Sequence, residues 1–288
     1  MSTFSSPYVS ALQTFYNAIG STYPTMGFHS ENAQRLVNAA GSAIKEGSWV
    51  LDLATGTGNV AFAAANKVGS TGRVLGIDIS DEFLRLASEA AKHLGVESFV
   101  DFLHRDVDQL AQLPGPYDKG RCFDVVTAGS AIGMFPSPSA LLDVVATELL
   151  KHGGLFVADV PGTNVPAKVF LDVAVPRGFR APMDPAWFSD PEQCFRDLFG
   201  KSKLELKTVV TNKLPSEGKW DAGTPEAVEK LWQSTVVEGT WVSFGIEKLD
   251  PNVLAEIKKA WIEELEGYKG EDGFIVAQRT QCLAIAMC

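Results

Sequence analysis

Strand-like and helix-like patterns alternate between residues 48 and 160, and this alternation constrains the fold more than any other feature. Short apolar runs typical of strands occupy residues 48–53, 73–78, 99–104, 123–129 and 155–160. Helical patterns lie between them at residues 59–68, 80–94 and 138–152, and Gly153 and Gly154 are expected to end the last of these helices. Repeated units of this length predict an α/β fold with a mostly parallel sheet and helices on both faces.

The segments that flank this core predict a lid and a cap. Residues 1–45 resemble two helices joined at residues 22–28, and we expect a helical lid there. Residues 46–211 form the predicted core, including a sixth strand at 204–211. Residues 212–270 form a predicted helical cap between the last two strands, and residues 271–288 carry the final strand, at 273–286. Five of the six tryptophans follow residue 186, so they either build a small core for the cap, line an aromatic pocket or form a dimer interface.

Composition excludes several classes of protein. The chain has 25 basic and 35 acidic residues, a net charge of −10, which disfavours a nucleic-acid partner. No uncharged apolar stretch reaches about 18 residues, and the first ten residues lack a signal-peptide pattern. The four cysteines and four histidines show no metal-ligand spacing. We therefore expect a cytoplasmic protein without a metal or a membrane segment, a monomer or homodimer, acting on a small molecule.

A glycine-rich loop carries the strongest indication of ligand binding. Residues 52–58 read Asp-Leu-Ala-Thr-Gly-Thr-Gly, and they join the first strand to the first helix. Glycine lets the backbone approach a ligand, and a helix N-terminus offers free N–H groups. The spacing from Gly56 to Ala61 even fits the dinucleotide fingerprint, with Asp78 placed for a ribose. However, Asp52 would repel a pyrophosphate and stands four residues before Gly56, so the pattern favours a ligand with a cationic amine and a ribose.

Taken together, residues 50–160 resemble the core of a class I S-adenosylmethionine-dependent methyltransferase. The motifs VLDLATGTG, GIDIS and RDV, then FDVVTAGSAIGMF and ELLKHGGLFVAD, follow the order and spacing of that family. The chain is most similar to the small-molecule branch, which includes quinone and fungal secondary-metabolite methyltransferases. The resemblance implies a Rossmann-like, seven-stranded sheet and S-adenosylmethionine as the cofactor. Ala54 stands where many members have a glycine.

The resemblance also implies a role for each residue of the cofactor site. Ala54, Thr55, Gly56 and Gly58 would pass under the methionine part, and Asp52 would lie near its amino group. Asp78 would bind both ribose hydroxyls, with Ile79 on the adenine. Asp106 would bind the adenine amine, with Val107 alongside. The Gly129 carbonyl, with Ser130 nearby, would hold the methionine end, and Tyr16 and Tyr23 would cover the cofactor or bind its carboxylate.

The sequence offers candidates for catalysis and leaves the acceptor open. His29 in the predicted lid and Asp159 at the end of the fifth strand are the candidate bases. The Asn/Asp-Pro-Pro-Tyr tetrad of nucleic-acid and protein amide N-methyltransferases is absent after the fourth strand, where residues 128–131 read AGSA. We therefore expect methyl transfer to the O, S, N or C atom of a small, partly apolar acceptor, in secondary or quinone-like metabolism. The alternatives are a cyclase or rearrangement enzyme that retains the cofactor, a cofactor-sensing protein and an NAD-dependent oxidoreductase.

Overall fold

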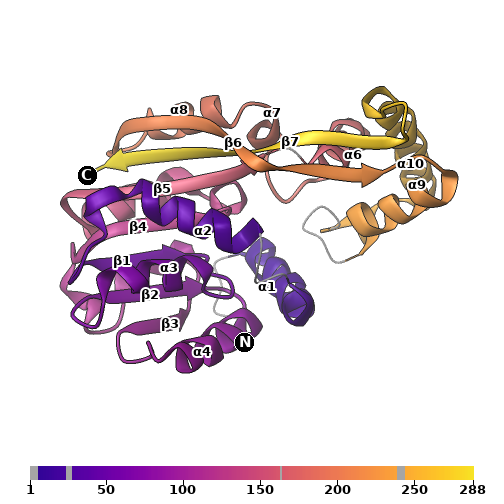
Figure 1. The fold of residues 1–288 in the computed structure, drawn as a ribbon. Helices are drawn as coiled ribbons and strands as arrows, with labels where there is room; N and C mark the ends of the chain where they lie inside the picture. Colours follow the sequence, from indigo (N-terminus) through magenta and orange to yellow (C-terminus); the bar gives the residue numbers. More distant parts are fainter. Residues whose placement is uncertain (1–5, 24–27, 163, 239–243) are drawn as a thin grey trace. The chain divides into compact units, whose positions relative to one another are not determined.

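The fold is built on one seven-stranded sheet. The computed structural model describes residues 6–23, 28–162, 164–238 and 244–288. The strand order is β3-β2-β1-β4-β5-β7-β6 (Figure 1). The strands are β1 (Trp49–Leu53), β2 (Arg73–Asp78), β3 (Val100–His104), β4 (Phe123–Gly129), β5 (Leu150–Gly162), β6 (Glu205–Asp221) and β7 (Phe274–Met287). β1 to β5 pair in parallel, which confirms the predicted fold class.

The last strand reverses direction in the sheet. The Cys288 N–H donates to the Gly154 carbonyl at 3.0 Å, and the Gly153 N–H donates to the Cys288 carbonyl at 2.9 Å. The end of β7 thus lies beside the start of β5, so the two strands are antiparallel. At the other end of β7, the Ala222 N–H donates to the Gly273 carbonyl at 2.9 Å, which joins the end of β6 to the start of β7.

Ten α-helices lie in the described ranges. They are α1 (Pro7–Ile19), α2 (Phe28–Ala39), α3 (Asn59–Val68), α4 (Asp81–Leu94), α5 (Pro138–Val144), α6 (Val165–Ala174), α7 (Ala186–Ser189), α8 (Pro191–Phe199), α9 (Pro225–Trp232) and α10 (Pro251–Leu265). Side-chain caps begin two of these helices, since Ser80 Oγ accepts from the Phe83 N–H at 3.2 Å before α4 and Thr224 Oγ1 accepts from the Ala227 N–H at 3.1 Å before α9. Within the described ranges, every helix is too short or too polar to cross a lipid bilayer.

The chain divides into two compact units. Unit 1 comprises Met1–Val160, Glu192–Val210 and Cys282–Cys288, and unit 2 comprises Pro161–Pro191 and Thr211–Gln281. In unit 1, valines on one face of β1, β2, β4 and β5 pack against apolar side chains of α2 and α3. Because side chains alternate along a strand, the neighbouring apolar residues face the opposite side, so helices cover both faces of the sheet. The predicted boundaries at residues 45, 211 and 270, and the position of the cap over the sheet, stay predictions.

Unit 2 has a core of its own, and tryptophans form much of it. Trp261 is fully buried, its ring lies 5.2 Å from that of Trp232, and its Nε1–H donates to the Pro166 carbonyl at 2.9 Å. Trp220 is partly buried against the same cluster. This packing supports the interpretation of the cap aromatics as structural for these three rings. Trp241 lies outside the described residues.

Several predicted element boundaries were wrong. The helix expected at 138–152 ends as a π-helix at Leu149, and β5 begins at Leu150, which pairs with Phe123. Gly153 and Gly154 therefore lie inside β5, not at the end of a helix. Both form backbone hydrogen bonds with Cys288, which follows β7. β6 continues past residue 211 to Asp221, so the first part of the predicted helical cap is a strand. The Gln278 side-chain amide of β7 donates a hydrogen bond to the Leu214 carbonyl, which helps to hold this part of β6 against β7. α9 ends at Trp232 and passes into a π-helix, and α2 begins at Phe28.

Truncation of the central tryptophan of unit 2 tests whether this cluster is a stabilising core. We expect Trp261→Ala to lower the free energy of unfolding by about 3–5 kcal/mol, because it removes a fully buried ring and its hydrogen bond. Lys259→Ala on the same helix is the control, since 80% of that side chain is exposed. Urea unfolding followed by circular dichroism measures both variants. A loss below about 1 kcal/mol for Trp261→Ala would show that the cluster is not a stabilising core.

Candidate active site

A cavity in unit 1 lies at the carboxyl ends of the parallel strands. Of the fifteen residues predicted for the site, fourteen line it: Tyr16, Tyr23, His29, Asp52, Ala54, Thr55, Gly56, Asp78, Ile79, Asp106, Val107, Gly129, Ser130 and Asp159. Ligands in open α/β sheets bind at this edge. The structure thus brings together candidates that are scattered over 144 positions of the chain, from residue 16 to residue 159.

The loop after β1 is held in a left-handed conformation. Ala54, Gly56 and Gly58 have φ angles of 52°, 56° and 90°. The Thr55 N–H donates to the Ile77 carbonyl at 2.9 Å, which fixes the loop against β2. Gly58 lies outside the lining residues and begins α3, where a Cβ would come within 2.6 Å of the Phe62 ring. Glycine is therefore required at position 58 by both its φ angle and its close contact.

Asp78 connects this loop to the end of β2. Its Oδ2 accepts from the Gly56 N–H and its Oδ1 from the Ser80 N–H, both at 2.8 Å. The residue is buried, and burial raises the pKa of its carboxyl group despite these bonds. A carboxylate offers about four acceptor positions, so this one can still accept bonds from a ligand. Two adjacent hydroxyls, as on a ribose, suit such an acceptor.

Asp52 lies at the end of β1 among hydroxyl groups. Thr55 Oγ1 donates to its Oδ2 at 2.6 Å, and Thr127 Oγ1 donates to its Oδ1 at 2.8 Å. Burial outweighs these two bonds and raises the pKa of Asp52 to about 7. A cation beside it would lower this pKa again, because an opposite charge favours the ionised form. Asp52 is thus suited to receive an ammonium group.

The residues expected around the adenine follow β2 and β3. Asp106 is buried and caps a short 3₁₀-helix (Val107–Gln112), where its Oδ1 accepts from the Asp108 N–H at 3.1 Å. Ile79 lines the cavity, and its carbonyl lies 2.9 Å from Nε2 of His104. Ile79, Asp106 and Val107 therefore lie on the β2–β3 side of the cavity.

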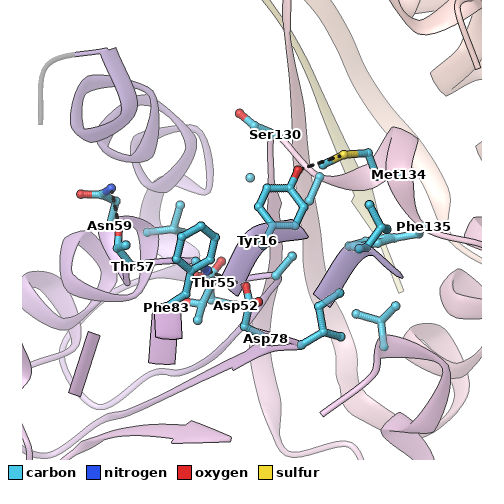
Figure 2. Close-up of a pocket in the computed structure, with 18 of the residues that line it drawn as sticks. Tyr16, Asp52, Thr55, Thr57, Asn59, Asp78, Phe83, Ser130, Met134 and Phe135 are labelled. Atoms are coloured by element: carbon cyan, nitrogen blue, oxygen red, sulfur yellow. Dashed lines mark hydrogen bonds between the residues drawn. The ribbon is translucent and has the colours of Figure 1, made fainter. Parts of the chain in front are cut away.

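Aromatic side chains from α1, from the segment after it and from α4 line one part of the cavity, and Figure 2 shows Tyr16 and Phe83 of this group. The Tyr16 hydroxyl donates to Met134 Sδ at 3.3 Å, and the Tyr16 ring lies 5.7 Å from that of Phe83. The Tyr23 ring, just beyond the helix, lies 5.0 Å from Phe83. Burial raises the pKa of both tyrosines, so both hydroxyls stay protonated and can donate hydrogen bonds at neutral pH.

Side-chain bonds attach α1 to the start of α4. Asn17 Oδ1 accepts from Ser80 Oγ at 2.7 Å and from the Glu82 N–H at 3.3 Å. Ser80 also binds Asp78 through its backbone N–H, so a single residue joins α1 to the carboxylate at the end of β2.

The two candidate bases line the cavity from α2 and from β5. His29 is half-buried near the start of α2, and its ring lies 5.1 Å from that of Tyr23. Burial lowers the pKa of His29, so its imidazole is neutral at pH 7 and able to take up a proton. Asp159 is buried near the end of β5, where its Oδ1 accepts from the Ser130 N–H at 2.9 Å. Ser130, which follows Gly129, has a left-handed φ of 54°.

Several residues that line the cavity were not predicted from the sequence. Phe83, Met134 and Phe135 come from the start of α4 and the segment after β4, and Asn32 comes from α2. The helix-cap motif at Ser80 already indicates that Phe83 faces inward. Asn32 precedes the buried Leu36 by four positions, so helical periodicity places both on one face. The cofactor-site roles that the family resemblance implies fall on residues at the strand ends and on two tyrosines, so they include neither Phe83 nor Asn32.

The charge of the cavity suits a cationic ligand. Asp52, Asp78, Asp106 and Asp159 all line it, each at least 92% buried, whereas Arg105 is the one lysine or arginine among the lining residues. Among the described residues, no three His, Cys, Asp or Glu side chains gather closely enough to hold a metal ion. Asp52, which accepts a hydrogen bond from Thr55, is suited to the amino group of S-adenosylmethionine. Asp78, at the end of β2 beside the left-handed loop, is suited to its ribose. A pyrophosphate would meet repulsion from Asp52.

Comparisons with known proteins agree with this geometry. Residues 44–177 match a family described as a methyltransferase domain. The demethylmenaquinone methyltransferase of Lactococcus lactis is 30% identical over 150 residues, 51% of this chain and 56% of that protein. The yeast (Saccharomyces cerevisiae) protein-lysine N-methyltransferase EFM4 is 31% identical over 124 residues, 42% of this chain and 54% of that protein. The chain thus spans about half the length of these curated relatives.

A likeness to solved structures extends over the whole chain. The crystal structure of the [4+2]-cyclase SpnF superposes with a TM-score of 0.57 and 16% identity, covering 99% of this chain and 98% of that one. At this identity the likeness concerns the fold alone. It indicates that β6, β7 and the helices between them belong to the same architecture as the matched domain.

The raised pKa of Asp52 predicts a specific pH dependence of stability. Its folded-state pKa of about 7 lies above its ordinary value of 3.8, so the folded protein binds more protons between these pH values. The contribution of Asp52 to stability is therefore fully present below about pH 4 and is lost as the pH rises through 7. We expect Asp52→Asn to abolish this fall, which amounts to a few kcal/mol. Urea unfolding at pH 5 and pH 8 measures it, and equal slopes with pH in both proteins would contradict the burial effect.

Proposed function

We propose that this chain, in which residues 44–177 form a class I S-adenosylmethionine-dependent methyltransferase domain, transfers the methyl group of that cofactor to a small, partly apolar acceptor. The observation that carries the proposal is the pair of buried carboxylates at the ends of β1 and β2, joined through the left-handed loop. Such a pair is complementary to an amine and a diol a few ångströms apart.

The proposed mechanism uses the protein to position groups and to exclude water. S-adenosylmethionine, when bound, supplies a methyl group already activated on a sulfonium. Asp78 would hold the ribose and Asp52 the amino group, while Asp106, Val107 and Ile79 would surround the adenine. The aromatic wall of Tyr16, Tyr23 and Phe83 would keep water away. Positioning of this kind can supply much of a rate enhancement in a displacement reaction.

A protonated acceptor also needs a base. The neutral imidazole of His29 and the Asp159 carboxylate line the cavity, and either would take a proton from a hydroxyl, thiol or amine as the methyl group is transferred. His29 has the more favourable setting, because its burial keeps it unprotonated at neutral pH.

The apolar part of the lining supports a small, partly apolar acceptor. Val9, Leu12, Leu36, Met134 and Phe135 lie around the cavity beside the polar groups. Quinone-like or secondary metabolism is consistent with such a pocket, and one curated relative is a demethylmenaquinone methyltransferase. A product without the mass of an added methyl group would instead support the cyclase or rearrangement alternative.

Removal of the ribose-binding carboxylate tests the cofactor site. We expect Asp78→Ala to weaken the binding of S-adenosylhomocysteine about ten-fold or more, because it removes the acceptor of two hydrogen bonds. Asp81→Ala is the matched control, since Asp81 lies three residues further on with 64% of its side chain exposed. Isothermal titration calorimetry measures both. Equal affinities in the two variants would place the ribose elsewhere.

Replacement of the candidate base tests the chemistry separately. We expect His29→Gln to lower methyl transfer to a protonated acceptor by about 10²–10⁴-fold while S-adenosylhomocysteine still binds. The acid limb of the wild-type pH–rate profile should lie below pH 6.5, because burial lowers the pKa of His29. His93→Gln, on the exposed surface of α4, is the control, and mass spectrometry of the product is the readout. If His29→Gln keeps full activity, the role of base falls to Asp159 or to no residue.

A further inference from the structure

Asn32, which lines the cavity, carries a buried hydrogen-bond donor without a partner among the described residues. Its side chain is 5% exposed and lines the cavity from α2. Its Nδ2 has no hydrogen-bond partner among the described residues, and it is the one buried side-chain nitrogen or oxygen there without a partner. Buried polar groups in folded proteins are nearly always bonded, and each exception calls for an explanation. A ligand that brings an acceptor atom would explain this one.

Arg35 fixes the direction of that donor. The Arg35 Nη2 donates to Asn32 Oδ1 at 2.6 Å, and Arg35 also lies 3.6 Å from Glu31 across one turn of the helix. A guanidinium can only donate, so the amide oxygen must face Arg35 and the amide nitrogen must point away from it. The same contact draws electron density toward the amide oxygen, which makes the N–H groups stronger donors.

Asn32 lines the cavity from α2, an element that carries none of the acids proposed for the adenosine. Leu36, one turn later on α2, reaches the ends of β4 and β5, where a Cβ on Gly129 would lie 3.4 Å from Leu36 Cδ2 and 3.9 Å from Asp159 Oδ1. The acids proposed for the ribose and the adenine follow β2 and β3, on the other side of β1. His29 precedes Asn32 by three positions and lines the same cavity. Asn32 therefore lines the cavity between His29 and Leu36 on α2, and Leu36 reaches the strand ends that carry Gly129 and Asp159.

The surroundings indicate which oxygen fits this donor. Four buried acids and Arg105 line the cavity, and a neutral oxygen can accept a hydrogen bond there without repulsion from the acids. Met134, Phe135 and Leu36 make the neighbouring lining apolar. These features suit an apolar ring that carries a hydroxyl or a carbonyl group.

We infer that Asn32 is a specificity-determining residue, which donates a hydrogen bond from Nδ2 to a hydroxyl or carbonyl oxygen on an apolar, ring-containing methyl acceptor. This inference rests on the proposed function for the identity of the ligand as the acceptor. It adds a named donor, Asn32 Nδ2, for the oxygen of such a ring.

A pair of probes of matched shape tests the inference. The probes are 1-naphthol, which carries a hydroxyl group, and 1-methylnaphthalene, which carries a methyl group in the same position. Each probe is titrated into the protein with and without S-adenosylhomocysteine. Asn32→Asp removes both donor hydrogens while it keeps the shape and the contact to Arg35. Asn38→Asp, on the exposed side of the same helix, carries the same chemical change as a control. Thermal melting followed by circular dichroism checks that each variant is folded, and Asn32→Leu repeats the test without an added charge.

We expect 1-naphthol to bind the wild type and Asn38→Asp about ten-fold more tightly than either Asn32 variant, as the loss of one directed bond implies. 1-Methylnaphthalene should bind the wild type and Asn32→Leu within about two-fold of each other. Equal binding of 1-naphthol to the wild type and both Asn32 variants, or no binding to any of them, would overturn the inference.

S-adenosylhomocysteine separates the two possible sources of the oxygen. We expect its affinity to agree within about two-fold between Asn32→Leu and Asn38→Asp. A ten-fold loss confined to the Asn32 variants would assign the donor to the cofactor's own carboxylate and overturn the acceptor assignment. If the wild type fails to bind S-adenosylhomocysteine at all, the proposed function fails, while the 1-naphthol titration without it still decides whether Asn32 recognises an oxygen.

Discussion

The hydrogen bond from the Gly56 N–H to the Asp78 carboxylate connects the loop after β1 to the end of β2, and the cavity depends on it. It requires Gly56 to keep a positive φ, and it places Asp78 beside the residues that follow Asp52. Because both acids are buried, each carries a desolvation cost that a cationic, hydroxyl-rich ligand would offset. The site is therefore organised for its ligand before the ligand arrives.

Much of the fold and of the site could be predicted because both follow from local signals. The strand at 73–78 matches its prediction, and so does the one at 123–129, since apolar runs and glycine-bounded loops are readable in one segment. The acids at strand ends were found because parallel topology brings such ends together. The helix end at Leu149 and the length of β6 were mispredicted, because both depend on pairing with distant residues, as the bonds of Cys288 and Gln278 show.

The later tryptophans show why composition alone leaves a question open. An aromatic-rich segment is compatible with a pocket, an interface or a core, and the contacts of the side chains distinguish these cases. Trp261 is fully buried against Trp232 and bonded to a carbonyl, so these rings support unit 2 itself. Asn32 differs from the tryptophans, because nothing in the sequence distinguishes it from other polar residues of a helix. The three-dimensional structure shows that its amide nitrogen is buried without a partner among the described residues.

A crystal structure of the protein with S-adenosylhomocysteine would show whether Asp78 and Asp52 bind the ribose and the amino group of this ligand. The account predicts both ribose hydroxyls within about 3 Å of the Asp78 carboxylate and the amino group beside Asp52 or joined to it by one water molecule. The homocysteine end would then lie beside Gly129 and Ser130 at the end of β4, which leaves Asn32 free for the acceptor. Density for the ligand away from Asp78, or a cavity that stays empty at saturating ligand, would contradict the account.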